Sequence, residues 1–358
     1  MNITRPDSPT HELTFFHRIK KKLMYWIRLT DKPVVKVYHG YGTQQQMFVF
    51  GHVFTLCPVP RKKYTRNIWT NTLALLRLFI VKPEKDATLE LIVEDKVLQK
   101  RTESDGFFRF DWKPVKHMEA GWHEVKISLL KIGKREIKGN ITGTGHVFVP
   151  HSNQYACISD IDDTFLISHS SNLRKRLFVL FTENAHSRKP FDGVVKHYQL
   201  LANAATLPDE LNPFFYVSSS EWNLYDYIDE FSRRNDLPPG IYLLSQIKTF
   251  SEIWKTGQNR HATKFMRIAR VLEAYPNQLF ILLGDDSQQD PVIYASVVEH
   301  FSKQIKAVYL RNVYEKNMTI VKGAIQKIEA AGISCCHFKH SAEAIEHSLK
   351  IGLVSEKI

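Results

Sequence analysis

The stretch Ile158-Ser159-Asp160-Ile161-Asp162-Asp163-Thr164 places three carboxylates at the end of a short apolar run. Side chains alternate along an extended chain, so we expect Asp160 and Asp162 on one side while Ile161 returns to the core. Two carboxylates about 6–7 Å apart along one edge suit a nucleophile and a proton carrier, with a hard cation on the first. The competing interpretation is a solvated acidic turn or an aspartate that caps a helix.

The sequence around this stretch alternates between apolar runs and helical patterns from Tyr155 onward. Runs typical of buried parallel strands occupy residues 156–158, 214–217, 279–283 and 305–310, and helical patterns occupy residues 221–234, 264–274 and 291–301. This alternation predicts an α/β fold with a doubly wound parallel sheet and right-handed crossovers. Ligands bind beyond the carboxyl ends of the strands in such sheets, so the residues after each run are candidates for a site.

Polar residues follow the other runs as well. Ser218-Ser219-Ser220 follows the second run and can bind phosphate at a helix start, although ordinary helix capping is the commoner role. Lys264 begins the helical pattern before the third run. Gly284-Asp285-Asp286-Ser287-Gln288-Gln289-Asp290-Pro291 follows that run, and its simpler interpretation is a turn that caps a helix. Cys335-Cys336-His337-Phe338-Lys339-His340 has soft-metal residue types, but Gly332-Ile333-Ser334 leads into it like a buried strand.

The order of these residues is more specific than any of them alone. An acid pair, a hydroxyl, a lysine and a second acid pair each lie at a strand end or helix start of one predicted sheet. Such a set can bind Mg²⁺ through oxygen ligands and hold a phosphate with Ser and Lys, which leaves Asp160 as the nucleophile. The residues therefore predict phosphoryl transfer through an aspartyl-phosphate.

The pattern Asp-x-Asp-x-Thr, Ser, Lys and Gly-Asp-x-x-x-x-Asp resembles the four motifs of the haloacid dehalogenase superfamily. More narrowly, residues 158–164 resemble the signature of its actin-patch-type phosphatidate phosphatase family and bacterial relatives. The resemblance runs from about Val35 to near the C-terminus and is specific in the α/β half. It is carried there by residues 188–194, 216–225, 280–294 and 309–313, and more weakly by residues 38–43 and 104–108 in the first half.

The resemblance implies a catalytic role for each matching residue. Asp160 would attack phosphorus, while Asp162 would protonate the leaving alcohol and later activate water. Thr164 would brace the first loop. The phosphoryl oxygens would be bound by Ser218, with Ser219 beside it, and by Lys264.

The same resemblance implies a Mg²⁺ site. Its ligands would be the Asp160 carboxylate, the Asp162 backbone carbonyl and Asp285, with Asp290 supporting the metal shell. The family usually reads Gly-Asp-Ser-Gly-Gln where this chain has Gly284-Asp285-Asp286-Ser287-Gln288, so Asp286 is a second candidate ligand. We favour Asp285 because it directly follows the strand and the glycine.

The first half of the chain has a different pattern. Short alternating segments separated by turn residues run from residue 34 to about residue 150 and predict a β-sandwich of about seven strands. We therefore expect a tail with a basic helix at residues 1–33, the β-sandwich at 34–152 and a haloacid-dehalogenase-like phosphatase domain at 153–358. A small cap is expected within the last domain, roughly at residues 165–213.

Composition and charge limit the class of protein. The chain has 358 residues, 43% of them hydrophobic, and a formal net charge of +12, which excludes a disordered or collagen-like chain and favours acidic partners. Residues 15–29 repeat apolar positions every fourth residue among cations, as in a helix on an anionic membrane surface or one packed on its own domain. No nucleic-acid-binding motif stands out, so no nucleic-acid partner is expected. Four scattered cysteines and no apolar leader or spanning run favour a cytoplasmic protein, peripheral on a membrane if residues 15–29 bind one.

The sequence thus predicts a Mg²⁺-dependent phosphatase that hydrolyses a phosphomonoester. The resemblance favours phosphatidate or a related lipid phosphate as substrate. One alternative is a phosphomonoesterase for a soluble phosphate such as a sugar phosphate or a nucleotide. The other is a non-catalytic module that binds lipid or protein.

Overall fold

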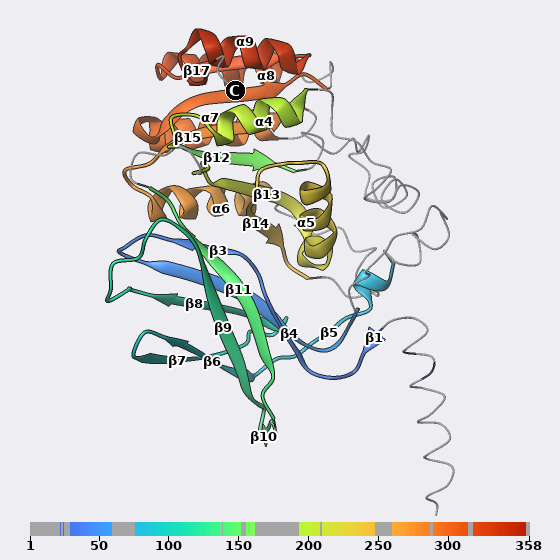
Figure 1. Ribbon diagram of the computed structural model, residues 1–358. Helices are drawn as coiled ribbons and strands as arrows, with labels where there is room; N and C mark the ends of the chain where they lie inside the picture. Colours follow the sequence, from blue (N-terminus) through green and yellow to red (C-terminus); the bar gives the residue numbers. More distant parts are fainter. Residues whose placement is uncertain are drawn as a thin grey trace, which may run out of the picture.

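The structure is a computed structural model that describes most of the chain. Residues 22 and 24 are described, as are the ranges 29–58, 76–137, 139–151, 155–161, 193–207, 210–247, 260–286, 289–313 and 318–355. Most of the predicted basic helix at residues 15–29 lies outside these residues, as do Asp162, Thr164 and residues 165–192 of the predicted cap. Figure 1 shows the described chain as two sheets, with helices around the second.

The first half of the described chain forms one eleven-stranded sheet. Long central β4 pairs antiparallel with β2 and β8, and the sheet continues through β3, β11, β9 and β6 to β7. Its elements are β1 (Leu29–Thr30), β2 (Val34–Val37), β3 (Gly40–Gly42), β4 (Met47–Pro58), the 3-10 helix η1 (Arg77–Phe79), β5 (Lys82–Pro83), β6 (Ala87–Val93), β7 (Lys96–Arg101), β8 (Phe107–Trp112), β9 (Gly121–Ile132), β10 (Arg135–Glu136) and β11 (Thr142–Val149).

Apolar side chains fill the interior of this half. Alternate residues of β4, such as Met47 and Val49, point inward and pack with residues of β6, β8 and β9 in one core. The strand-rich character of residues 34–150 is therefore confirmed. The predicted sandwich is not, because hydrogen bonds join the described strands of this half into one sheet.

The second half forms a six-stranded parallel sheet in the order β14-β13-β12-β15-β16-β17. Helices α6, α7 and α8 pack side by side, and α4 packs against α9, so right-handed crossovers place these two groups on opposite faces. The elements are β12 (Tyr155–Asp160), α4 (Val194–Ala202), β13 (Phe214–Glu221), η2 (Trp222–Leu224), α5 (Tyr225–Arg234), β14 (Gly240–Ser245), α6 (Arg260–Ala274), β15 (Leu279–Asp285), α7 (Asp290–Phe301), η4 (Ser302–Gln304), β16 (Ile305–Arg311), α8 (Met318–Ala330), β17 (Ser334–Phe338) and α9 (Ser341–Lys350).

The predicted parallel sheet is confirmed, and its strand order creates a switch point. The chain moves outward from β12 through β13 to β14 and then returns to β15 on the other side of β12. The crossovers leave β12 and β15 in opposite directions, so a crevice forms at their carboxyl ends. The described part of the predicted cap includes α4, whose buried Val194, Tyr198 and Leu201 belong to the same core as the strands of the parallel sheet. Among the described helices, none has both the length and the apolar character needed to cross a bilayer.

The two halves share one hydrophobic core through β3 and the residues before it. Tyr38 stacks on Trp222 with ring centroids 4.2 Å apart, and Tyr41 meets the ring of Phe215 edge-on at 5.5 Å. The Nδ1–H group of His39 donates to the carbonyl of Gly240 at 3.2 Å. These contacts fix the first half against β13, β14 and the helical turn that follows β13.

Truncation of Tyr38 should test this shared core. Tyr38 is fully buried, so Tyr38→Ala should lower the free energy of unfolding by about 3–5 kcal/mol, measured by urea denaturation. Tyr38→Phe is the matched control, because it removes only the hydroxyl that lies 3.1 Å from His52 Nδ1 and should cost about 1 kcal/mol. Equal losses in the two variants would contradict the role of the ring.

Buried His52 should make the fold sensitive to acid. Burial, helped by the charge of Lys36, lowers the pKa of His52 to about 3, whereas an unfolded histidine has a pKa of about 6.5. Between these values the unfolded chain binds a proton that the native chain does not, so stability falls as the pH falls below about 6.5. Between pH 7 and pH 5, His52 should lower the free energy of unfolding of wild type by about 2 kcal/mol. Urea denaturation of His52→Asn over the same pH range should show a loss that is smaller by this amount. Parallel pH profiles for the two proteins would exclude this role of His52.

Candidate active site at the carboxyl edge of the parallel sheet

Asp160 is the last residue of β12, at the switch point of the parallel sheet. It is buried and paired in register with Val217 of β13, which brings it beside Ser218. The strand end is held from below by Ser159, whose hydroxyl lies 2.7 Å from the Tyr198 hydroxyl of α4. Apolar packing on both faces of β12 thus delivers a carboxylate to the crevice in a fixed position.

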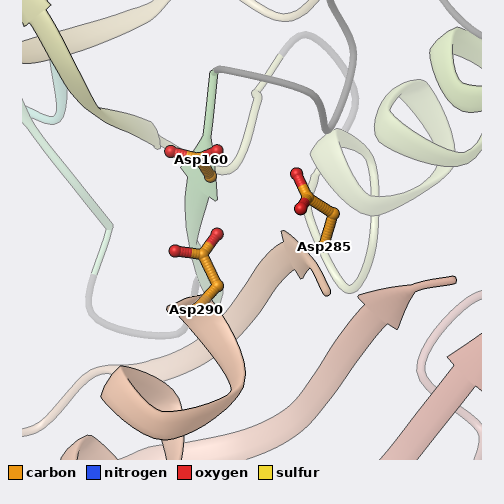
Figure 2. Close-up of side chains that lie close together, drawn as sticks. All are labelled: Asp160, Asp285 and Asp290. Carbon is orange, nitrogen blue, oxygen red and sulfur yellow. The ribbon is translucent and has the colours of Figure 1, made fainter. Parts of the chain in front are cut away.

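Two further carboxylates meet Asp160 at this edge. Asp285 ends β15 and Asp290 begins α7, and each of the three buried residues offers an oxygen within 4.8 Å of the others. Figure 2 shows the three side chains close together, although Asp160 is distant in sequence from the other two. Oxygen donors at this spacing suit a hard divalent cation.

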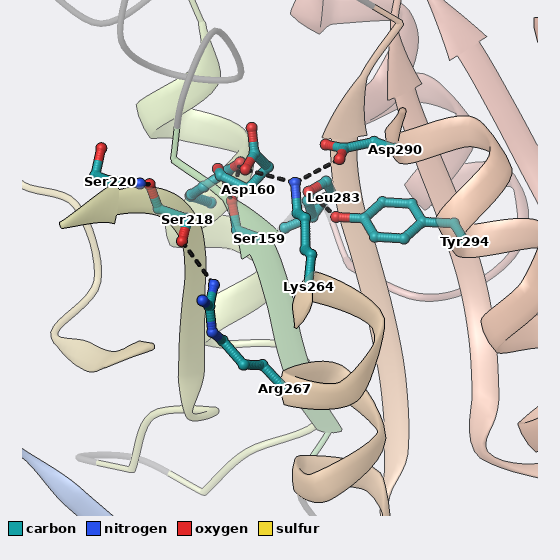
Figure 3. A network of polar contacts seen from close by, with 10 residues as sticks. Ser159, Asp160, Ser218, Ser220, Lys264, Arg267, Leu283, Asp290 and Tyr294 are labelled. Carbon is teal, nitrogen blue, oxygen red and sulfur yellow. Dashed lines mark hydrogen bonds and ion pairs between the residues drawn. The ribbon is translucent and has the colours of Figure 1, made fainter. Parts of the chain in front are cut away.

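Lys264 of α6 supplies a cation within this cluster. Its Nζ donates to Asp160 Oδ1 at 2.7 Å and also to Asp290 Oδ1 (Figure 3). Burial alone would lower the pKa of Lys264, but the charges of the two aspartates and their hydrogen bonds raise it above its ordinary value. Three ionised carboxylates and one ammonium leave a formal charge of −2, which a divalent cation would neutralise.

Gly284 allows the carboxylates to approach so closely. A Cβ atom at this position would lie 2.7 Å from Asp290 Oδ2 and 2.8 Å from the ring of Tyr294. Asp290 Oδ2 is buried and has no hydrogen-bond partner among the described residues. A buried carboxylate oxygen without a donor is costly unless a cation binds it, so this donor set fits a divalent metal.

Asp286 lies apart from the cluster, although the sequence offered it as a candidate ligand. Its Oδ1 accepts from the backbone N–H of Val313 at 2.7 Å, and its Oδ2 lies 3.1 Å from His337 Nε2. Adjacent residues at a strand end point to opposite sides, so Asp285 faces Asp160 while Asp286 faces β16 and β17. The geometry therefore favours Asp285 over Asp286 as the metal ligand.

The serine segment continues β13 and does not open a helix. The strand extends to Glu221, and the buried Ser218 hydroxyl accepts from the backbone N–H of Ser220 at 2.8 Å. Ser219 is half-buried in the same strand. The edge of the sheet thus brings Ser218, Asp160, Lys264 and Asp285 together as predicted, while Asp162 and Thr164 lie outside the described residues.

Arg267 is a residue of this edge that the sequence interpretation missed. Its guanidinium donates to the Ser218 carbonyl at 3.0 Å and to the Ser245 hydroxyl at 3.1 Å, which ties the ends of β13 and β14 together. Burial, with the nearby charge of Arg270, lowers its pKa to about 10. The available signal was its position three residues after Lys264, which is the same face of a helix.

Comparison with known proteins agrees with this geometry. Residues 155–312 match the family model described as "Phosphatidate phosphatase APP1, catalytic domain". The phosphatidate phosphatase APP1 of Saccharomyces cerevisiae is 33% identical over 157 residues, which cover 43% of this chain and 25% of that protein. Residues 155–312 are thus similar to the catalytic domain of this family.

Two other similarities are weaker. An uncharacterized protein of Schizosaccharomyces pombe is 23% identical over 173 residues, covering 48% of this chain and 27% of that protein. The chain thus spans about a quarter of the length of the curated relatives it matches. A crystal structure of a carbohydrate acetylesterase from Xanthomonas citri covers 86% of this chain and 68% of that chain, but its TM-score of 0.30 and 10% identity support no argument about the fold.

Removal of Lys264 should destabilise the protein, because the carboxylates of the cluster then repel one another without a compensating cation. Lys264→Met leaves Asp160 and Asp290 without their cation, so it should lower the free energy of unfolding in EDTA by about 3–5 kcal/mol. A divalent cation should recover part of this loss in the same urea denaturation. Lys322→Met, at an exposed position of α8, is the matched control and should stay within about 0.5 kcal/mol of wild type. A similar result for both variants would show that the cluster does not depend on Lys264.

Proposed function

We propose that this protein is a Mg²⁺-dependent phosphatase that hydrolyses a phosphomonoester through an aspartyl-phosphate on Asp160, with a lipid phosphate as substrate. The observation that carries the proposal is the buried contact of Lys264 with Asp160 and Asp290 beside Asp285, at the switch point of a parallel sheet. The match of this region to a phosphatidate phosphatase catalytic domain supports the reaction class.

The proposed reaction uses the chain's own groups. A carboxylate oxygen of Asp160 forms the new bond to phosphorus, while the bond from phosphorus to the alcohol oxygen breaks. The leaving alcohol takes its proton from Asp162, which we propose as the acid on the basis of its motif. Water then gives a proton back to Asp162 and attacks the phosphorus of the aspartyl-phosphate, which releases inorganic phosphate and restores the Asp160 carboxylate.

The remaining polar groups orient the phosphoryl group and balance its charge. Lys264, held by Asp290, places a fixed positive charge next to the nucleophile. Ser218, in the neighbouring strand, is proposed to bind a phosphoryl oxygen, with Ser219 beside it. Asp160 and Asp285 would hold the Mg²⁺ ion, which when bound would neutralise charge on the phosphoryl oxygens.

The proposal of a lipid phosphate rests on two observations. The family model that matches residues 155–312 and the yeast relative are both named phosphatidate phosphatase, and the chain has a formal net charge of +12 that favours an anionic surface. Contact with a membrane through residues 15–29 is part of this proposal. A phosphatase for soluble phosphomonoesters would use the same four motifs. Only the substrate that the protein hydrolyses therefore distinguishes a lipid phosphatase from a phosphatase for soluble substrates.

Phosphate release from two substrates should test the function. Wild type should release phosphate from short-chain phosphatidate in mixed micelles when Mg²⁺ is present and lose this activity in EDTA. Asp160→Asn should abolish release because an amide is not a nucleophile for phosphorus. An aryl phosphate, assayed in parallel, tests whether the protein hydrolyses a phosphomonoester that has no lipid part.

The controls separate the parts of the proposal. Asp236→Asn changes an exposed aspartate of the same half and should keep wild-type activity. Release from the aryl phosphate alone would keep the chemistry and reject the lipid. Activity that survives in Asp160→Asn would reject the nucleophile, and no release from either substrate by wild type would favour a binding module.

A further inference from the structure

Asp286 joins the ends of three strands through one buried side chain. Its backbone N–H donates to the Arg311 carbonyl at the end of β16 at 3.0 Å, and its Oδ1 accepts from the N–H of Val313 at 2.7 Å. Its Oδ2 lies 3.1 Å from Nε2 of His337 on β17. An ionised carboxylate can only accept, so Nε2–H of His337 is the donor.

This arrangement controls the neighbouring ligand of the cluster. Asp285 and Asp286 share a peptide unit directly after the buried part of β15, and Asp285 is paired in register with Arg311. Because the two side chains lie on opposite sides of the backbone, a rotation that releases Asp286 from His337 also turns Asp285 away from Asp160.

His337 is placed to hold this arrangement. It lies in β17, paired in register with Leu310 of β16, and its side chain is 19% exposed while that of Asp286 is fully buried. The backbone N–H of Asn312 donates to the carbonyl of Phe338, which fixes the end of β17 beside the end of β16. His337 therefore presents its ring to Asp286 from a rigid strand.

We propose that His337 is a positioning residue for the divalent cation: through Asp286 it holds Asp285 in the geometry that the metal requires. This inference rests on the proposed metal site. His337 itself touches neither substrate nor metal. Direct hydrogen-bond partners of a metal ligand typically change metal affinity by about 10- to 100-fold when removed, and His337 acts one residue further out, through Asp286, so we expect the lower end of this range.

The test measures metal binding without turnover. Binding of Mn²⁺ to the full chain is followed by the free-ion signal in electron paramagnetic resonance, for wild type, His337→Ala and His337→Gln. His337→Ala should bind Mn²⁺ about 10-fold more weakly. His337→Gln keeps an N–H donor near the position of Nε2 and should recover most of the affinity. His300→Ala, an exposed histidine on α7, is the matched control and should bind as wild type.

Asp286→Asn weakens the same contact from its other partner, so it tests the inference even where His337→Ala folds poorly, and the two changes are combined in a double-variant cycle. If His337 acts only through Asp286, the double variant should bind Mn²⁺ no more weakly than the weaker single variant. In phosphate release, the His337 variants should need more metal for half-maximal rate but recover wild-type kcat at saturation.

The outcomes distinguish this inference from the proposed function. Wild type that binds no Mn²⁺ would reject the metal site and this role together. If wild type and His337→Ala bind Mn²⁺ equally tightly, the role of His337 is rejected and the metal site is kept. Additive losses in the double variant would also reject it, because the two residues would then act independently.

Discussion

The buried contact of one ammonium with two carboxylates is the constraint on which the site depends. Three carboxylates within 4.8 Å of one another would repel strongly in an apolar interior, and Lys264 offsets much of that repulsion. The contact requires β12 to end at Asp160, α6 to bring its first turns to the same edge and α7 to begin at Asp290. The strand order is the feature that makes these distant segments neighbours.

The eleven-stranded sheet belongs to this arrangement, although the family model matches only residues 155–312. Tyr38 stacks on Trp222, which directly follows the segment from Ser218 to Glu221. Lys36 adds an ion pair with Asp226 of α5 at 2.7 Å. The first half therefore supports the backbone that carries the proposed phosphate-binding serine.

Local patterns predicted the part of the molecule that depends on local chemistry. Apolar runs ending in acids identified β12, β15 and their carboxylates, and the favoured ligand Asp285 agrees with the observed cluster. Strand β14 was not predicted, although Ile241-Tyr242-Leu243-Leu244 is an apolar run like the others. The hydrogen bonds of Asp286 and Arg267 could not be predicted from the sequence. They join strand ends, and which strand ends are neighbours depends on the order of the whole sheet. The single sheet of the first half was missed for the same reason: alternation shows which face is buried but not which strands pair.

The shared core has a thermodynamic consequence for the whole chain. Tyr38, Tyr41 and Phe50 of the first half belong to the same buried cluster as the strands of the parallel sheet. Neither half can expose this surface without exposing the other, so both are expected to unfold together in one cooperative transition. A ligand bound at the carboxyl edge of the parallel sheet would then protect β-strands that it never touches, because it lowers the free energy of the only folded state available to them.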